Sequence, residues 1–326
     1  MTAAQRSGIL VVDKPAGLSS AKVVALVKKA VGARKTGHVG TLDPFATGVL
    51  VCCFIEATRL ARFLMQGRKT YQAVLHLGVR TDTLDATGTV LEAVPEAALT
   101  TLTERGVVAV AKRFEGRIQQ LPPVYSALKH NGTPLYRLAR KGRPVQKPPR
   151  AVRIFELRVD TVRLPRVHFT VQCSAGTYIR TLAADMGDAL GCGGHLESLR
   201  RTASSGFTLE DALPLEAISP GNRDARAVVA DHWIDMAAAL KGMPGFRADS
   251  RLAEKIAYGQ RLTTRDVPGV DREGAYIKII GNHGDLIAVL EHQPGRGYYT
   301  YCCVLTSPQH AAASAAQTPD RPKGGN

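Results

Sequence analysis

GHVGTLDPFATGVL, residues 37–50, is the stretch that decides how this sequence is interpreted. It contains one acidic residue, Asp43, which stands directly before Pro44, and the apolar run 49–55 follows closely. Glycines in the stretch permit sharp turns, and Pro44 fixes the chain direction after the acid. A single carboxylate on such a loop beside buried structure is typical of a positioned reactive group. The alternative is a turn in which Asp43 accepts a backbone N–H, and the loop taken alone favours this turn.

The length and composition indicate a globular protein. With 326 residues, 44% of them hydrophobic, the chain can form one large domain and a smaller one. Its longest apolar-leaning uncharged run, 44–55, is shorter than the roughly 20 residues that span a bilayer. The first residues, MTAAQRSG, lack the pattern of a signal peptide. We therefore expect a soluble cytoplasmic protein without membrane attachment.

The six cysteines include two pairs of sequence neighbours, and none has the spacing of metal ligands. Buried free thiols in a reducing compartment are the favoured interpretation, and a redox-sensing vicinal pair is the alternative. No metal site is predicted.

The net charge of +15 favours a polyanionic partner. No acidic residue occurs between Glu115 and Glu156, and Tyr125 and Tyr136 are interleaved with the basic residues there. The basic residues are Arg117, Lys129, Arg137, Arg140, Lys141, Arg143, Lys147, Arg150 and Arg153. An ordinary solvated face would mix the two signs. The stretch thus indicates a surface that docks RNA through its phosphates.

The order of expected elements indicates an α+β fold with a mixed or antiparallel sheet. Strands are expected at 8–13, 70–77, 152–164 and 166–173, and helices are expected at about 20–31, 134–141 and 176–190. Ser19 or Ser20 caps the first helix and Gly32 ends it, while Thr133 caps the second. Short strands at 276–280, 286–291 and 298–305 indicate a small β-rich domain.

Four further segments accompany the Asp43 loop, in the same order, in one known family. They are DKPAGLSS (13–20), KTYQAVLHLGVRTDTLDATG (69–88), PPVYSALKHNGTPLYRLARKG (122–142) and CSAGTYIRTLAADMGDALGCGGHLESLRR (173–201). Together the five segments resemble the tRNA pseudouridine synthase B family, and the resemblance covers about residues 8–305. Departures are modest: Ala175 stands where members often carry Lys, which removes one phosphate contact but no reactive group.

The resemblance implies a domain organisation. Residues 1–235 would form an α+β pseudouridine synthase catalytic domain with a mixed or antiparallel sheet, and its basic RNA-docking insert would lie at about 122–150. Residues 246–305 would form a small β-barrel-like, PUA-type RNA-binding domain. Residues 306–326 are expected to be a disordered tail.

The resemblance also implies a reaction. Family members isomerise a uridine, usually uridine 55, in the T loop of tRNA: the N1–C1′ bond breaks, the uracil turns, and it rejoins through C5. Because electrons are neither gained nor lost, no cofactor is expected. The family's catalytic carboxylate falls on Asp43, and its cationic partner falls on Arg180, which is able to grip both oxygens. The sequence leaves open whether Asp43 attacks C1′, attacks C6 or removes a sugar proton.

The matching positions further imply a uridine pocket. Tyr71 is the active-site tyrosine, expected to stack on the extracted base and able to take the C5 proton later. Tyr178 and Leu199 match residues that line the pocket. His38 matches a residue that enters the T loop and contacts RNA.

Other basic residues are expected to support the loop or the RNA. Lys14 is assigned to support of the Asp43 loop, with a phosphate contact as the alternative, and Arg200 and Arg201 are assigned as phosphate or active-site supports. The insert residues assigned to RNA binding are Lys129, Arg140, Lys141 and Arg143.

The sequence therefore predicts a stand-alone, monomeric tRNA pseudouridine synthase that needs no protein partner, cofactor or metal. The catalytic subunit of a guide-RNA-directed pseudouridylase is the nearest alternative, since it shares these motifs. A tRNA-folding factor that acts chiefly by binding is a second alternative. An unrelated aspartyl hydrolase would explain Asp43 but not the charge or the other four motifs.

Overall fold

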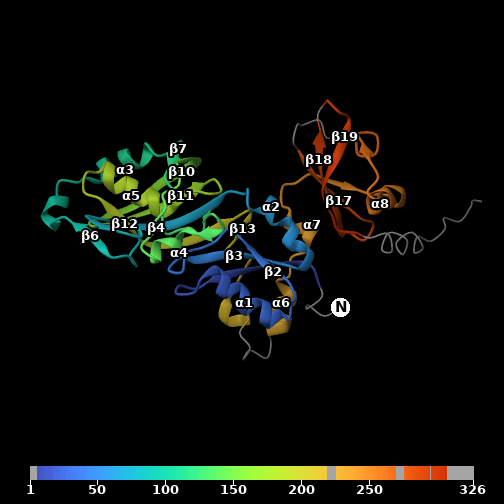
Figure 1. The fold of residues 1–326 in the computed structure, drawn as a ribbon, viewed down its shortest axis with the longest axis horizontal. Helices are drawn as coiled ribbons and strands as arrows, with labels where there is room; N and C mark the ends of the chain where they lie inside the picture. Colours follow the sequence, from blue (N-terminus) through green and yellow to red (C-terminus); the bar gives the residue numbers. More distant parts are fainter. Residues whose placement is uncertain (1–5, 219–224, 269–274, 294, 307–326) are drawn as a thin grey trace, which may run out of the picture. The chain divides into compact units, whose positions relative to one another are not determined.

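The computed structural model describes residues 6–218, 225–268, 275–293 and 295–306 (Figure 1). Clustering of the chain gives two compact units. Of the described residues, those in Leu10–Cys53 and Ala61–His232 belong to the first unit, and those in Arg6–Ile9, Phe54–Leu60 and from Trp233 onward belong to the second. Apart from Thr306, the tail expected at 306–326 lies outside the described residues.

A ten-stranded mixed sheet forms the centre of the first unit, as the sequence predicts. Its main path is β14 (Ala212–Pro214), β1 (Gly8–Lys14), β3 (Thr47–Phe54), β12 (Gly194–Ser204), β4 (Lys69–Leu77), β11 (Arg166–Cys173), β10 (Arg150–Arg163) and β7 (Gly116–Gln120). Off this path, β2 (Thr36–Val39) pairs with β3, and β13 (Phe207–Thr208) pairs with β12. The pairs β1–β14 and β3–β12 are parallel, whereas β12, β4, β11, β10 and β7 follow one another antiparallel.

The core of this unit lies on one face of the sheet. Alternating residues of β4, including Tyr71, Ala73 and Leu75, point into it. Two helices, α3 (Glu104–Lys112) and α5 (Ile179–Ala189), cover the same face with apolar residues of their own (Figure 1). The helical spacing in α5 buries Ile179, Leu182 and Met186 against the sheet, and this contact stabilises both elements.

The helix boundaries confirm some local expectations and correct others. Helix α1 (Ser20–Val31) begins after Ser19, whose side chain accepts from Lys22 N, and ends at Gly32 in the left-handed region. Helix α5 begins three residues later than expected, because Gly176 has φ +86° in the preceding turn. The prediction that Thr133 caps the basic helix is wrong, since Pro134 occupies the cap position.

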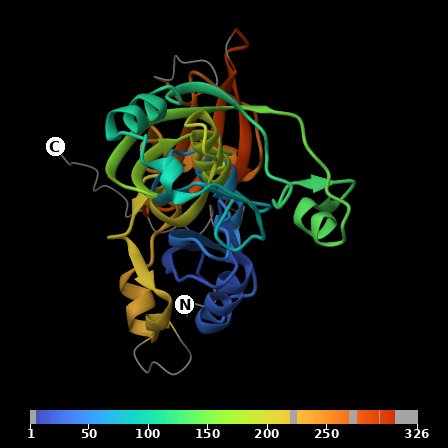
Figure 2. The same cartoon turned by 90° about the vertical axis from the view of Figure 1, so that its left-hand side faces the viewer.

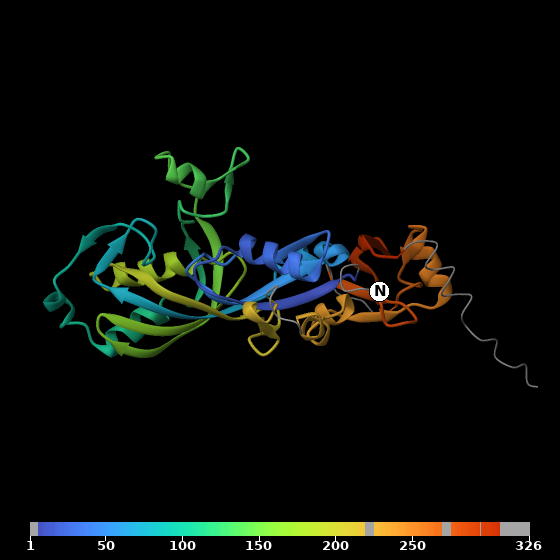
Figure 3. The ribbon, with the colours of Figure 1, turned by 90° about the horizontal axis from the view of Figure 1, so that it is seen from below.

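The segment between β7 and β10 stands off the sheet. It contains the short pair β8 (Lys129–His130) and β9 (Thr133–Pro134), and helix α4 (Leu135–Arg140) follows directly. Figures 2 and 3 show this segment in green as an arm that projects from the first unit. The basic stretch of the sequence is therefore presented on a projection.

The second unit contains a curled five-stranded sheet. Its order is β15 (Gly245–Arg247), β17 (Tyr276–Ile280), β18 (Leu286–Gln293), β19 (Tyr298–Val304) and β16 (Leu262–Thr263). Helix α8 (Ser250–Ala257) begins after Asp249, whose side chain accepts from Leu252 N, and packs Leu252 and Ile256 into the core of this sheet. The three strands predicted here are confirmed.

The remaining elements are short. They are the helices α2 (Ala61–Leu64), α6 (Ala225–Asp231) and α7 (Met236–Ala239), the 3-10 turns Ile55–Leu60, Glu96–Leu99 and Leu215–Ile218, and the hairpin of β5 (Val79–Thr81) with β6 (Val90–Ala93).

All six cysteines are thiols rather than disulfides. Cys52 and Cys53 are fully buried in β3, and burial raises the pKa of the Cys53 thiol to about 12. A thiol that stays protonated is a poor nucleophile, so this pair fits a packing role better than redox sensing. Cys192 and Cys302 are only half-buried, contrary to the expectation for all six.

Gly48 lies where β3 approaches β12 most closely. Its φ is +103°, and a Cβ placed on it would stand 2.2 Å from the carbonyl oxygen of Arg201, its partner in the ladder. We expect Gly48→Ala to lower the free energy of unfolding by about 3 kcal/mol, because backbone must move to admit the methyl group. Gly142→Ala is the control, since Gly142 also has a positive φ but no atom within 4 Å of that position. Its loss should be about 1 kcal/mol. Equal losses in urea unfolding would show that the close approach has no energetic weight.

Candidate active site

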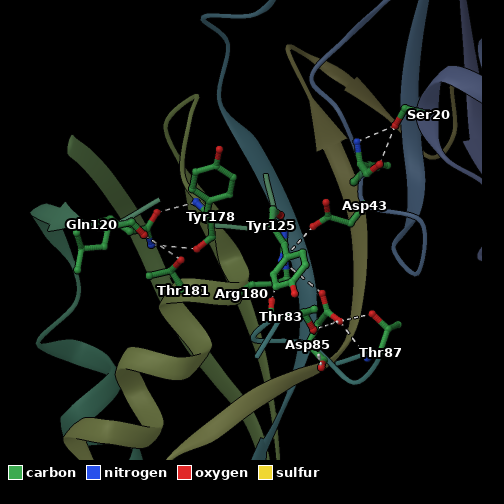
Figure 4. A network of polar contacts seen from close by, with 12 residues as sticks. Ser20, Asp43, Thr83, Asp85, Thr87, Gln120, Tyr125, Tyr178, Arg180 and Thr181 are labelled. Carbon is green, nitrogen blue, oxygen red and sulfur yellow. Dashed lines mark hydrogen bonds and ion pairs between the residues drawn. The ribbon is translucent and has the colours of Figure 1, made fainter. Parts of the chain in front are cut away.

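The loop that carries Asp43 joins β2 to β3 and is fixed on both sides of the acid. The buried Ser20 hydroxyl accepts from Leu42 N at 2.8 Å and donates to Leu42 O at 2.9 Å. On the other side, Gly17 N donates to Pro44 O at 2.8 Å. These bonds position the Asp43 backbone, and its side chain remains 36% exposed (Figure 4).

Lys14 also holds this loop. Its side chain is fully buried, and Nζ donates to Pro15 O at 2.7 Å and to Pro44 O at 3.2 Å. Burial lowers the pKa of Lys14 to about 8, while the nearby Asp43 charge acts in the opposite direction. The bonds support the loop-holding role predicted for Lys14, and a buried ammonium is not placed for a direct phosphate contact.

Arg180, at the start of α5, reaches Asp43 across 137 positions of sequence. Its Nε donates to Asp43 Oδ2 at 2.9 Å, and its side chain is 4% exposed. Nη1 donates to Thr83 O at 2.7 Å and Nη2 donates to Tyr125 O at 2.8 Å (Figure 4). The guanidinium therefore holds one carboxylate oxygen, not both as expected, and Oδ1 has no hydrogen bond to any of the described residues. No backbone N–H donates to the Asp43 carboxylate in the described part of the chain, so the turn-capping interpretation is wrong.

Asp85 is a second carboxylate beside Arg180 and was missed in the sequence. Its Oδ2 lies 3.5 Å from Arg180 Nη1, and its side chain is 6% exposed. Oδ1 accepts from Thr83 Oγ1 at 2.8 Å, from Thr87 N at 3.0 Å and from Thr87 Oγ1 at 2.5 Å. Asp85 belongs to the stretch 69–88 that carries the family resemblance, and membership of this stretch was the only feature of the sequence that pointed to a role for Asp85. Its local pattern otherwise matches an ordinary polar turn.

Loss of the Asp85 charge should weaken the whole arrangement. We expect Asp85→Asn to lower the free energy of unfolding by about 2 kcal/mol and turnover by about tenfold, because Arg180 loses a buried counter-charge. Asp188→Asn is the matched control. Its ion pair with Arg80 is 49% exposed on the Asp188 side, so removal should cost less than about 1 kcal/mol. Similar losses for both variants in urea unfolding would contradict the role given to Asp85.

Tyr71 and Leu199 lie in one buried cluster with Leu42 and Ala46 of the Asp43 loop. Burial raises the pKa of the Tyr71 phenol, the Arg201 cation lowers it, and the Asp43 charge raises it further. The structure thus places Tyr71 and Leu199 beside the Asp43 loop.

Tyr178 occupies the N-cap position of α5, next to this cluster. The buried Gln120 side chain accepts from Tyr178 N at 2.7 Å and donates to Tyr178 O at 2.9 Å. The Arg150 guanidinium lies over the Tyr178 ring, 4.5 Å from its centroid. The backbone is fixed, while the ring stays half-exposed and able to contact a ligand.

His38 lies in β2 with its ring half-buried. Burial lowers the pKa of His38, and the Arg201 cation lowers it further. Its Nδ1 has no hydrogen-bond partner in the described part of the chain. The imidazole is therefore neutral near pH 7 and keeps a polar atom without a partner.

The four insert residues predicted to bind RNA are exposed, and none has a carboxylate within 4.0 Å among the described residues. They are Lys129, Arg140, Lys141 and Arg143. Arg140 also lies 5.7 Å from the Tyr136 ring centroid. Unpaired cations on a projecting arm are available to an anionic ligand.

Among the described residues, no group of three or more His, Cys, Asp or Glu side chains is placed to hold a metal ion. None of the helices in that part of the chain is long and apolar enough to cross a membrane.

Comparison with known proteins decides the family. Residues 28–179 match the model of the TruB family pseudouridylate synthase N-terminal domain, and residues 180–231 match the tRNA pseudouridylate synthase B C-terminal domain. The chain belongs to the TruB family. It is therefore a pseudouridine synthase, which is an isomerase, and the prediction from the five segments is confirmed.

Individual TruB relatives are similar over most of their length. The tRNA pseudouridine synthase B of Burkholderia mallei (strain NCTC 10247) is 42% identical over 293 residues, which cover 88% of this chain and 94% of that protein. The protein of the same name from Geotalea uraniireducens (strain Rf4) is 44% identical over 252 residues, 77% of this chain and 80% of that one.

A solved structure shares the fold. The crystal structure of a Cbf5-Nop10-Gar1 complex contains a chain with a TM-score of 0.71 and 25% identity, covering 93% of this chain and 86% of that one. The mixed, sheet-dominated architecture is thus that of TruB and Cbf5 proteins.

Proposed function

We propose that this TruB protein converts uridine 55 in the T loop of tRNA to pseudouridine, and that Asp43 is its catalytic residue. The observation that carries the proposal is the Asp43–Arg180 contact. Arg180 donates to Oδ2 and is itself anchored to two backbone carbonyls, so Oδ1 is held in place and keeps no hydrogen bond within the described part of the chain. The assignment of tRNA as the substrate rests on relatives that carry the name tRNA pseudouridine synthase B.

In the proposed reaction the target uridine leaves its stack and enters the site. Tyr71, Leu199 and Tyr178 receive the base, and Asp43 acts on the sugar or base to release the N1–C1′ bond. The uracil turns, C5 bonds to C1′, C5 loses its proton and N1 gains one. His38 contacts the displaced nucleotides of the loop as a neutral ring.

The projecting arm, about residues 122–150, would hold the RNA. Its basic residues form a run that has no carboxylate partner among the residues the structure describes, which suits the phosphates of a T stem. We assign catalysis to residues 1–235 and RNA binding by a PUA-type domain to residues 246–305. The change from the first unit to the second near Trp233, and the five-stranded sheet with its own core, support these assignments, although Arg6–Ile9 and Phe54–Leu60 belong to the second unit.

The proposed enzyme acts alone, as a cytoplasmic monomer without a guide RNA or obligatory partner. A guide-dependent catalytic subunit is the second candidate, because the Cbf5 chain in its complex has the same fold. The higher identity to the two TruB relatives, 42% and 44% against 25%, favours the stand-alone form.

The test is site mapping on unmodified tRNA transcripts with purified protein and nothing else added. We expect pseudouridine at position 55 and no product at that position in a transcript with cytidine there. Product only after addition of a guide RNA would move the assignment to the second candidate. RNA binding without any product would leave a folding factor.

The arm should control affinity through charge. We expect the triple change of Arg140, Lys141 and Arg143 to Gln to reduce the slope of log K against log salt by about 2 to 3, because each phosphate contact contributes about 0.7 to 0.9. The control is the triple change of Arg105, Lys112 and Arg113 to Gln, exposed cations on or next to α3. Filter binding at several salt concentrations measures both slopes. Equal slopes for the two triples would remove the arm from RNA binding.

A further inference from the structure

Arg201 lies inside the sheet, between the strand that follows the Asp43 loop and the strand that carries Tyr71. It is on β12, and its ladder partners are Gly48 of β3 on one side and Tyr71 of β4 on the other. Cross-strand partners on one face are close neighbours. A side chain at this point can therefore act on the strand that leaves the Asp43 loop and on the Tyr71 ring together.

The guanidinium binds the Asp43 loop at both ends. Nε donates to Val49 O at 2.7 Å, and Nη2 donates to Gly40 O at 2.9 Å. Gly40 precedes Asp43 by three residues and Val49 follows it by six. One rigid planar group thus fixes the distance between the two ends of the loop, which a single-point ammonium cannot do.

Arg201 keeps its charge without a counter-ion. Its side chain is fully buried, and no carboxylate lies within 4.0 Å of it among the described residues. Its field also reaches two other buried cations and, together with burial, lowers the pKa of Lys14 to about 8 and that of Lys69 to about 8. Burying such a charge costs folding free energy, so its retention points to a role beyond packing.

Among the described residues, one nitrogen of the guanidinium lacks a partner at normal hydrogen-bond distance. Nη1 is buried and has no hydrogen-bond partner in the described part of the chain. Gly40 leaves room for it, because a Cβ there would stand 3.2 Å from Nη1 and 3.2 Å from Lys69 Cε. The charge of Arg201 and a hydrogen bond from its side chain both lower the pKa of Tyr71, so they favour the phenolate, which is the form that can accept a proton.

We propose that Arg201 is a positioning residue that clamps the Asp43 loop and stabilises the Tyr71 phenolate that then takes the C5 proton. This inference rests on the function proposed above. Once C5 has bonded to C1′, its proton moves to the phenolate oxygen and the C–H electron pair returns to the ring. N1 takes a proton from water, and Tyr71 later returns its own to water, so no net proton is released.

The groups that act on Tyr71 set the sign of a pH test. They are the Arg201 cation on β12, the Cys173 thiol on β11 and the Asp43 carboxylate on the loop. The Arg201 cation favours the phenolate. A weaker interaction between the cation at position 201 and the phenolate raises the pKa of Tyr71. The pH at which the rate of the chemical step rises should therefore move upward. A residue with only a packing role would lower the amount of folded protein without moving this profile.

The experiment compares Arg201→Lys with wild type and with Arg166→Lys. Arg166 is the control, because it lies on β11 of the same sheet, is 53% exposed and pairs with Glu197 of β12 at 2.9 Å. Single-turnover tritium release from C5-labelled T-arm RNA is measured from pH 6 to 10, with the Kd for the RNA and the melting temperature.

For Arg201→Lys we expect a single-turnover rate about 100-fold below that of wild type, with a Kd for the RNA within about threefold of the wild-type value. The rise of the rate with pH should be displaced to higher pH. Arg166→Lys should stay close to wild type in rate and profile. An Arg201→Lys rate and profile equal to those of Arg166→Lys would overturn the inference. Absence of release by wild-type protein would instead remove the proposed function.

A second variant decides the matter if Arg201→Lys does not fold. Gly40→Ala keeps Arg201 and pushes on its Nη1 group. A slower chemical step in folded Gly40→Ala protein, with unchanged RNA affinity, supports the clamp. A wild-type rate in that variant overturns it.

Discussion

Asp43→Asn should lower turnover by more than about 1,000-fold while the affinity for T-arm RNA changes by less than about twofold. The amide has the size of the carboxylate and still offers an oxygen to Arg180 Nε, so the loop keeps its shape. It lacks the negative charge and the nucleophilic oxygen that the reaction needs. RNA phosphates lose no contact, because they would bind the arm of α4 rather than this carboxylate.

The measurement pairs single-turnover rates with filter binding for Asp43→Asn, wild type and the exposed-acid control Asp188→Asn. Only the first variant should lose its rate. Turnover within about tenfold of wild type would remove Asp43 from the chemistry, whatever its position. A large loss of affinity would show instead that the carboxylate organises the RNA-binding surface.

Arg180→Ala should remove turnover as completely and also destabilise the fold by about 4 kcal/mol. The variant leaves Asp85 buried without its cation, and it takes hydrogen-bond donors from Thr83 O and Tyr125 O. Asp43, at 36% exposure, loses only its positioning and can be solvated. The stability loss therefore arises mainly at Asp85, whereas the activity loss arises at Asp43.

A surface arginine provides the control for that experiment. Arg166 pairs with Glu197 but is 53% exposed, so Arg166→Ala should change the free energy of unfolding by less than about 1 kcal/mol. Urea unfolding and single-turnover rates are measured for both variants. An Arg180→Ala protein as stable and as active as Arg166→Ala would mean that the guanidinium network carries neither stability nor function.

The sequence predicted the pair Asp43 and Arg180 because both stand in segments that resemble the family. It also predicted β4, since the alternation in 69–77 is that of a half-buried strand. Local patterns of this kind depend on neighbouring residues and can be recognised without a structure.

Asp85 and Arg201 could not be resolved in the same way. An acid between threonines has the local pattern of an exposed turn, and only the distant Arg180 makes it a buried counter-charge. Arg200 and Arg201 are adjacent in the sequence, yet the first is partly exposed and pairs with Asp13 while the second is fully buried. Which of two neighbouring cations points inward depends on the pairing of β12 with β3 and β4, which is set by tertiary contacts.

The central claim is that Asp43 drives isomerisation of uridine 55 without help from another molecule. The most direct test is tritium release from C5-labelled uridine 55 in an unmodified T-arm stem-loop, with wild type and Asp43→Asn compared and no guide RNA, partner protein or cofactor added. The account predicts complete release by wild type and none by the variant. Equal release by the two proteins, or none by wild type that has bound the RNA, would contradict it.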